Sequence, residues 1–142
     1  MEATAFGTYI IVENFHSHGV PIEELYAAGG LPERNGFLMQ FYADVTNRPI
    51  KVARSAQAPA VGSAMFGAVA AGANRGGYAS IFDAAKRMGG VKDKVFRPRA
   101  KEHKAYRRLF DEYVTLHDYF GRGNNDVMKR LKAIKADAVR GK

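Results

Sequence analysis

Residues 25–40 read Leu25-Tyr26-Ala27-Ala28-Gly29-Gly30-Leu31-Pro32-Glu33-Arg34-Asn35-Gly36-Phe37-Leu38-Met39-Gln40. This run predicts a short buried strand, a double-glycine turn and the start of a helix. Glycine has no Cβ, so a nucleotide can approach the backbone at Gly29 and Gly30, where the free N–H groups of a helix N-terminus would face it. A plain strand-to-helix turn has the same pattern, and the chain contains neither a G-x-G-x-x-G run nor a P-loop sequence. Taken alone, the double glycine is therefore a weak indication of a nucleotide site.

The elements on either side extend this pattern into an α/β arrangement. Apolar periodicity, glycines and prolines predict that residues 1–75 alternate between helices and strands, with helices crossing over between the strands. The expected helices cover residues 3–18, 32–45 and 59–71, the expected strands cover 24–28 and 49–52, and a loop covers 74–77. The third of these helices is rich in small residues, which let another backbone pack closely.

Beyond residue 77 the pattern becomes mostly helical. Ser80 is expected to cap a short helix over 81–88, residues 91–98 are extended, and a long amphipathic helix covers 101–120. Asn124 or Asn125 is expected to cap a last helix. Six residues form the apolar face of the long helix, which the spacing favours as core over a platform that stacks nucleic-acid bases: Tyr106, Leu109, Phe110, Tyr113, Leu116 and Phe120.

Composition limits the class of protein. The chain has 142 residues, the size of one domain, and 46% of them are hydrophobic, enough for a core. No apolar run reaches the length of about 18 residues that a membrane span needs. The start, Met1-Glu2-Ala3-Thr4, lacks the basic residues of a secretory signal, and the absence of cysteine fits a reducing cytoplasm. A soluble cytoplasmic domain without a membrane partner is expected.

The positive charge is confined to the second half. The net charge of +8 divides into −1 for residues 1–75 and +9 for residues 76–142. A basic half is compatible with a nucleic-acid partner, which makes a free-standing nucleic-acid-binding module one alternative. The basic residues alternate with acidic and apolar ones, however, which favours solvated helix faces and no nucleic-acid partner.

Three separated runs resemble one family. Residues 28–45 (AGGLPERNGFLMQFYADV), 48–50 (RPI) and 58–64 (APAVGSA) resemble the adenosine motif and second connecting helix of the FGGY carbohydrate kinases, which share the fold of actin and the heat-shock ATPases. Residues 2–8 (EATAFGT) and 116–131 (LHDYFGRGNNDVMKRL) look like the ribulokinase branch. The resemblance implies part of an actin/hexokinase-like (ribonuclease H-like) C-terminal lobe with few strands in residues 1–75, and a basic, mostly helical extension of that lobe in 76–142.

The resemblance also implies an activity for a longer parent chain. A kinase of this branch transfers the γ-phosphoryl group of ATP, with Mg²⁺, to the terminal hydroxyl of L-ribulose; a xylulokinase or a glycerol kinase is the alternative within the family. The family's first phosphate loop, sugar pocket and catalytic aspartate would all lie in a missing N-terminal lobe. No catalytic residue is therefore expected here, the segment should be inactive alone, and Met1 would be an artificial start.

The resemblance assigns roles to individual residues. Gly29 and Gly30 would let the backbone contact the α-phosphate and ribose of ATP, with Leu31 beside them. Arg34 stands where related kinases often carry an asparagine facing adenine, so either Asn35 supplies that contact or Arg34 stacks on the ring. Gly62 would be the hinge glycine of the connecting helix.

The other candidates are weaker. His16 and His18 lack the further ligands of a metal site, so no metal-ligating residue is expected. Asp44 and Asp118 could serve as general bases, but Asp44 ends a helix beside core residues and the family resemblance implies a base elsewhere. His103 and His117 suit a surface or packing role. Without the other lobe, the small-residue helix 59–71 would expose apolar surface and promote a homodimer.

Overall fold

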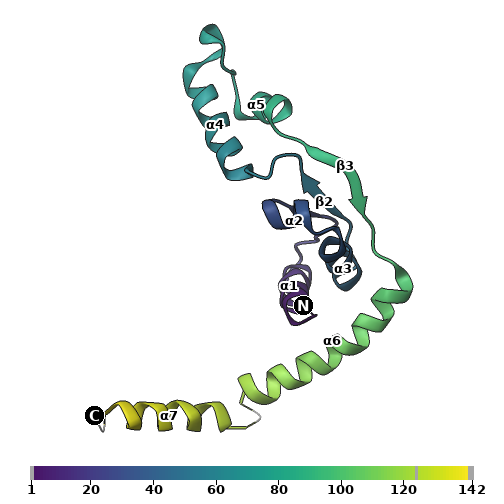
Figure 1. The fold of residues 1–142 in the computed structure, drawn as a ribbon, viewed down its shortest axis with the longest axis vertical. Coiled ribbons are helices and arrows are strands. Elements are labelled where there is room, and N and C mark those ends of the chain that lie inside the picture. Colours follow the sequence, from purple (N-terminus) through teal and green to yellow (C-terminus); the bar gives the residue numbers. More distant parts are fainter. Residues whose placement is uncertain (1, 124, 141–142) are drawn as a thin grey trace. The chain divides into compact units, whose positions relative to one another are not determined.

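The computed structural model describes residues 2–123 and 125–140, so the expectations for Met1 and Asn124 lie outside the described residues. The chain divides into two compact units, one up to His103 and one from Lys104 onward, and each is described by itself. Figure 1 shows the element order. The first unit contains α1 (Glu2–Ser17), β1 (Leu25–Ala27), α2 (Gly30–Arg34), α3 (Gly36–Thr46), β2 (Ile50–Ala53), α4 (Ala58–Ala71), α5 (Ile81–Met88) and β3 (Val91–Phe96). Helix α6 (Ala100–Gly121) begins in the first unit and continues into the second, which also contains α7 (Val127–Arg140).

The three strands form one sheet in the order β1-β2-β3. Strands β1 and β2 are parallel, with Ala27 opposite Val52, whereas β3 runs antiparallel to β2. A parallel pair needs a crossover connection, and here helices α2 and α3 provide it. The predicted α/β class, with few strands and a mostly helical continuation, is confirmed.

The prediction of one continuous helix over residues 32–45 is wrong. The chain forms α2, breaks at Asn35 (φ −126°, ψ 79°) and restarts as α3. The break occurs because the Asn35 side chain caps the new helix: its Oδ1 accepts a hydrogen bond of 2.9 Å from the N–H of Leu38. Pro32 accordingly belongs to the short helix α2 and not to the long one.

One face of the sheet carries the core of the first unit. Helices α1 and α3 pack against each other, and α3 packs against β2 and β3. Ile50 and Val52 alternate toward this core, while Tyr26, 61% exposed, stands on the edge strand β1. The buried apolar side chains of these elements are Ala5, Phe6, Tyr9, Val12, Leu38, Met39, Phe41, Ala43, Val45, Ile50, Val52 and Phe96.

A buried carboxylate attaches the start of α6 to α3. Asp44 is 0% exposed, and its oxygens accept hydrogen bonds from the Arg99 side chain (Nη2–Oδ2 2.6 Å), from the Arg99 backbone N–H (2.8 Å) and from Gln40 Nε2 (2.9 Å). His103 Nδ1 lies 2.9 Å from the backbone oxygen of Asp44. Residues 97–103 are thereby fixed to the C-terminal turn of α3.

Helices α4 and α5 form a hairpin at the carboxyl end of β2. Its close approach depends on Gly77, because a Cβ there would lie 1.9 Å from the backbone oxygen of Ala68, which accepts a hydrogen bond from the N–H of Tyr78. Ser80 caps α5 as predicted, accepting from the N–H of Asp83 at 3.1 Å. A short 3₁₀ turn over Ala73–Arg75 overlaps the start of the predicted loop at 74–77. No residue of α4 is buried.

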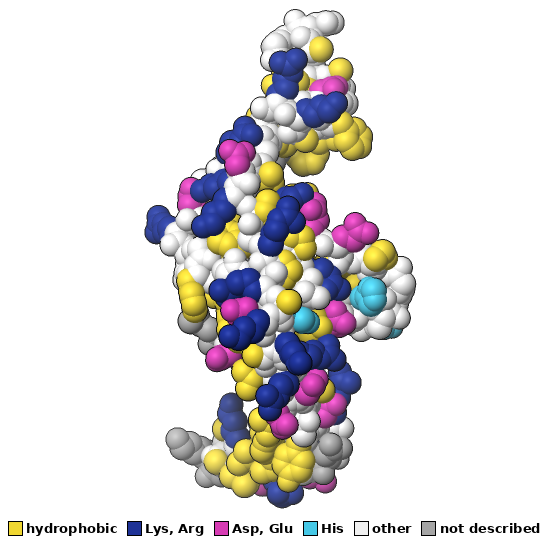
Figure 2. Space-filling view, turned by 90° about the vertical axis from the view of Figure 1, so that its right-hand side faces the viewer, with side chains coloured by type: hydrophobic (Ala, Val, Ile, Leu, Met, Phe, Trp, Pro, Cys, Tyr) yellow, Lys and Arg dark blue, Asp and Glu magenta, His cyan; other side chains and the backbone are white. Residues whose placement is uncertain are grey.

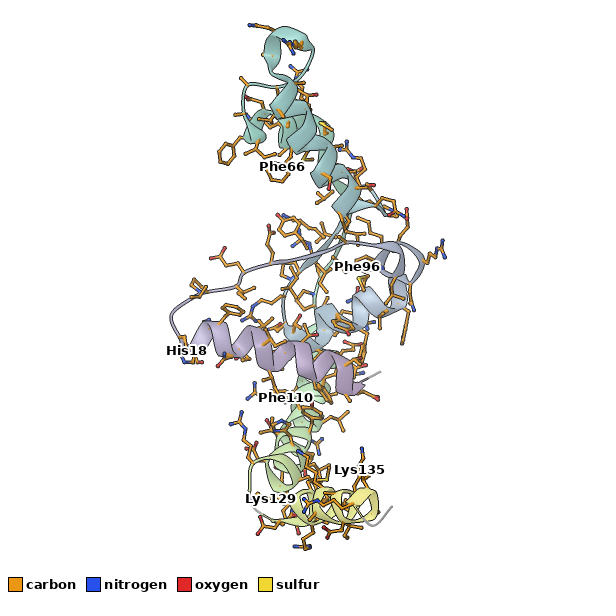
Figure 3. All side chains as sticks on the ribbon, turned by 90° about the vertical axis from the view of Figure 1, so that its left-hand side faces the viewer. His18, Phe66, Phe96, Phe110, Lys129 and Lys135 are labelled. Carbon is orange, nitrogen blue, oxygen red and sulfur yellow. The ribbon has the colours of Figure 1, made fainter. Side chains whose placement is uncertain are left out.

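The second unit consists of the continuation of α6 and of α7. Asn125 Oδ1 accepts from the N–H of Val127 at 2.9 Å, which is the capping contact expected there. The expectation of a core along the apolar face of α6 is wrong for most of that face: Phe110 is buried, but Leu109, Leu116 and Phe120 are about half exposed. A single amphipathic helix cannot bury its own stripe: among the six predicted residues only Phe110 is buried by the described part of the chain, while Tyr106 and Tyr113 are partly covered. Figure 3 labels Phe110 on this helix.

Candidate nucleotide site

The double-glycine turn leaves the carboxyl end of β1 with an open backbone. Gly29 has φ 102° and ψ 178°, a conformation that is essentially restricted to glycine, and Gly30 is the first residue of α2. A Cβ built on either glycine would meet no heavy atom within 4 Å. The turn can therefore be approached closely by a ligand.

A cavity of about 390 Å³ opens beside the turn. Leu31, 61% exposed, contributes to its wall, and Tyr42 of α3 and Thr8 of α1 reach it from the helices. Its full lining is Thr8, Leu25, Tyr26, Ala27, Ala28, Leu31, Pro32, Leu38, Met39, Tyr42 and Ile50. Because most of these are apolar, the cavity suits the flat or apolar part of a ligand.

The two candidates for an adenine contact, Arg34 and Asn35, differ in whether the side chain is held by a hydrogen bond to the backbone. Asn35 uses its side-chain oxygen to cap α3, whereas the Arg34 side chain is exposed at the end of α2. Of this pair, Arg34 is the residue whose side chain can reorient toward a ligand.

A second cavity, of about 240 Å³, is lined by residues of α2 and β3. Pro32, Glu33 and Gly36 face it from the helices, and Lys92, Lys94 and Phe96 from β3, with Val52 completing its lining. Lys92 Nζ lies 2.9 Å from Glu33 Oε1, and this hydrogen bond is the main reason that the pKa of Glu33 is lowered from its usual value. Lys94 Nζ stands 4.7 Å from the centre of the Phe96 ring.

Sequence reasoning missed this cluster. The signal was present, since Lys92, Lys94 and Phe96 alternate along the segment that was expected to be extended and so share one face of a strand. What the sequence did not provide is the pairing of this strand with β2 and the contact of Lys92 with Glu33 on α2.

Gly62 is not brought to the glycine turn. It lines a separate cavity of about 570 Å³ at the start of α4, together with Arg54 and Met65 among others. A Cβ on Gly62 would meet nothing within 4 Å, so no packing within the described residues requires a glycine there.

The remaining candidates have structural surroundings. Asp44 is completely buried and bonded to Arg99, so it cannot act as a general base on a ligand. His103 lies edge-to-face against Tyr9 at 6.5 Å, a packing role, while the half-exposed His117 pairs with Asp118 at 3.0 Å. Within residues 2–123 and 125–140 no three His, Cys, Asp or Glu side chains are grouped as metal ligands. In the same part of the chain no helix is long and apolar enough to span a membrane.

Comparison with known proteins identifies the family. The model of the C-terminal domain of the FGGY family of carbohydrate kinases matches residues 1–71, half of the chain. The chain belongs to this family. The expected resemblance is confirmed, and the reading as part of a carbohydrate kinase holds over a free-standing nucleic-acid-binding module.

Relatives of known name extend the match beyond residue 71. The chain is 63% identical to a ribulokinase of Halalkalibacterium halodurans over 96% of its length, 59% to one of Geobacillus thermodenitrificans over 97%, and 48% to one of Mycolicibacterium smegmatis over 99%. In each case it spans about a quarter (24%) of the relative's own length.

Solved structures agree on the fold. A ligand-bound xylulose kinase from Lactobacillus acidophilus matches 66% of the chain with a TM-score of 0.54 and 26% identity, covering 18% of that protein. A xylulose kinase from Rhodospirillum rubrum matches 82% of the chain with a TM-score of 0.63 and 22% identity, covering 22% of that protein. The second likeness, at this identity, concerns the fold alone.

Proposed function

We propose that this chain supplies the adenosine side of the ATP site in a ribulokinase, an enzyme that transfers the γ-phosphoryl group of ATP to L-ribulose. The observation that carries the proposal is the bare Gly29-Gly30 turn at the carboxyl end of a parallel strand, the edge at which ligands bind in open α/β sheets. Relatives of 48–63% identity that are named ribulokinase favour ribulose over the xylulose and glycerol alternatives.

The residues have separate roles in this proposal. The backbone at Gly29 and Gly30 lies against the α-phosphate and ribose, Leu31 borders them, and Arg34 or Asn35 faces the adenine. Gly62 is the hinge of the connecting helix α4. The open surface around Gly62 supports contact with another lobe, because nothing in the described part of the chain occupies it.

Phosphoryl transfer depends on positioning and on neutralising charge, with Mg²⁺ bridging the phosphates. Mg²⁺ is usually bound by one or two carboxylates together with phosphates and water. The carboxylates nearest the glycine turn do not fit this task, since Glu24 is bonded to Lys51 and Glu33 to Lys92. We therefore assign the metal ligands, the sugar pocket and the catalytic base to the N-terminal lobe of the longer relatives.

The first prediction is that the 142-residue chain alone phosphorylates no ribulose and binds ATP only feebly, because most phosphate contacts lie outside it. A coupled assay of ADP release and isothermal titration with ATP would measure both. A chain of the relatives' length that carries this segment, assayed in parallel, is the control and should turn over. Ribulose phosphorylation by the segment unaided would contradict the proposal.

The second prediction is that the chain self-associates through α4. Phe66 is 68% exposed on a helix without any buried residue, and Figure 2 shows hydrophobic side chains at the surface of the molecule (Figure 3 labels Phe66). Exposed apolar area of this kind promotes association. Sedimentation analysis should show a dimer at high concentration, which the Phe66→Glu variant converts to monomer.

A matched change on α6 tests whether α4 is the interface. Leu116 is 58% exposed, and Leu116→Glu should leave the dimer intact. A wild-type chain that stays monomeric, or a dimer that only Leu116→Glu dissociates, would show that α4 does not mediate association.

We also place the segment in the cytoplasm, without a nucleic-acid partner. The absence of cysteine supports a reducing compartment. Basic residues of the terminal helices have acidic neighbours, such as Arg107 with Asp111 at 3.4 Å and Lys129 with Asp126 at 2.8 Å, and Figure 2 shows the two signs interspersed. A mixed surface lacks the continuous positive stripe that binds nucleic acid.

A further inference from the structure

Helix α7 carries an apolar face that the described part of the chain leaves uncovered. We call this face the α7 stripe; it consists of Val127, Leu131, Ile134 and Ala138, which are spaced four, three and four residues apart. Leu131 is 53% and Ile134 64% exposed, and none of the residues of α7 is buried. Apolar residues at this spacing are typical of a helix that packs along another helix. The stripe therefore has the form of a contact surface.

The helix forms without a partner for this stripe. Asn125 Oδ1 accepts a hydrogen bond of 2.9 Å from the N–H of Val127, and Asp126 lies 2.8 Å from Lys129 in the first turn. An isolated helix of 14 residues is only marginally stable in water, so these local contacts do not replace packing. A partner that covers the stripe would stabilise the whole helix.

The polar surface of α7 is strongly basic. Its ionisable residues are five cations and one acid, namely Lys129, Arg130, Lys132, Lys135, Arg140 and Asp137. At about 100° per residue, Lys132 and Lys135 border the stripe on one side and Arg130 borders it on the other. Figure 3 labels Lys129 and Lys135 on this helix. A surface that receives the stripe is most complementary if acidic side chains stand at its rim.

A second copy of α7 does not meet this requirement. Two such helices packed stripe against stripe, in either direction, would bring cations against cations, because each helix contributes five cations and one acid. Like charges along the flanks of a helix pair destabilise it. Nucleic acid would neutralise the cations but leave the apolar stripe in water. The partner therefore combines an apolar groove with an acidic rim.

We infer that α7 docks, with its stripe inward, in an acid-rimmed apolar groove on the N-terminal lobe of a kinase of the relatives' length. The match to the Mycolicibacterium smegmatis ribulokinase covers 99% of this chain and so reaches α7, whereas the FGGY domain match ends at residue 71. This chain spans only 24% of that relative, so most of the surface available to α7 lies in the rest of the polypeptide. A groove on the same polypeptide meets the helix at an effective concentration of about 1 mM, which favours it over a separate protein.

The test is amide hydrogen exchange of α7 in a kinase of the relatives' length that carries this segment. Leu131→Glu would place a carboxylate in the apolar groove and release the helix, so the α7 amides should exchange about tenfold faster than in the wild type. Sedimentation analysis should give the same mass for both enzymes, because the contact lies within one polypeptide. If Leu131→Glu does not fold, Leu131→Ala, which only removes contact area, is measured in its place.

Ala133→Glu is the matched control. Ala133 is exposed and lies about 200° around the helix from Leu131, on the opposite face. The same carboxylate at this position should leave the exchange rates of α7 within about twofold of wild type. Lys135→Met tests the acidic rim: it should speed exchange by about threefold at about 0.01 M salt and by less at about 1 M, where the Debye length is only about 3 Å.

Two results overturn the inference. The first is exchange in α7 that is as fast in the wild-type enzyme as in Leu131→Glu, or that Ala133→Glu accelerates equally. The second is protection of α7 that disappears on dilution together with a dimer, since a second copy would then cover the stripe. Neither result bears on the nucleotide site, whose failure would appear as a Gly29→Val enzyme with unaltered ATP kinetics.

Discussion

Replacing Asp44 with alanine is expected to lower the free energy of unfolding of the first unit by about 3 kcal/mol. The carboxylate is 0% exposed and accepts hydrogen bonds from the side chain and the backbone N–H of Arg99 and from Gln40. Its removal leaves the backbone N–H of Arg99 and the half-exposed Arg99 guanidinium without this acceptor. The loss exceeds that of a surface ion pair, which contributes about 0–1 kcal/mol.

The measurement is urea denaturation followed by circular dichroism, with amide hydrogen exchange in α3 and β2 to report the first unit separately. Asp44→Asn keeps the shape of the side chain and should cost less, about 1–2 kcal/mol, because one oxygen still accepts. Asp93→Asn, an exposed carboxyl on β3, should stay within about 0.5 kcal/mol of wild type. Equal stabilities of Asp44→Ala and Asp93→Asn would show that the Asp44–Arg99 pair does not hold the start of α6.

The role of Asp44 also illustrates what the sequence could not provide. Asp44 and Arg99 are separated by 55 positions, and no local pattern pairs them. The same reason hid the cavity between α2 and β3, since Glu33 and Lys92 are 59 positions apart. Long-range partners follow from how strands align, whereas sequence periodicity reports only which face of an element is apolar.

Turns and helix caps were predicted more accurately than long-range contacts, because they depend on residues that are close in the sequence. The glycine turn after a strand and the Ser80 cap each depend on a few neighbouring residues, and both were predicted correctly. The break between α2 and α3 also depends on a local contact, but the sequence did not reveal it. Asparagine occurs inside helices as well as at their caps, and the apolar face continues past Asn35, so the pattern favoured one unbroken helix. The assignment of residues 1–75 to the end of the kinase's C-terminal lobe, and of 76–142 to a basic helical extension of that lobe, stays a prediction.

Gly29→Val is expected to lower kcat/KM for ATP by about a hundredfold in a kinase of the relatives' length, while the KM for ribulose changes less than about twofold. Two effects combine. With φ 102° and ψ 178° the native backbone is open essentially to glycine alone, so a β-branched residue adds about 1–3 kcal/mol of strain. The new side chain also occupies the open space in which the α-phosphate and ribose would lie.

Two further variants separate these effects from general destabilisation. Gly29→Ala imposes much of the strain with little added bulk, so its loss in kcat/KM for ATP should be intermediate. Gly7→Ala lies inside α1, where a Cβ meets nothing within 4 Å, and should keep wild-type kinetics with equal or higher stability. If the nucleotide lies against the glycine turn, the substitutions at Gly29 should change the kinetic constants for ATP more than those for ribulose. A Gly29→Val enzyme with normal ATP kinetics would place the nucleotide elsewhere, because no ligand lying against this backbone could tolerate a valine side chain between them.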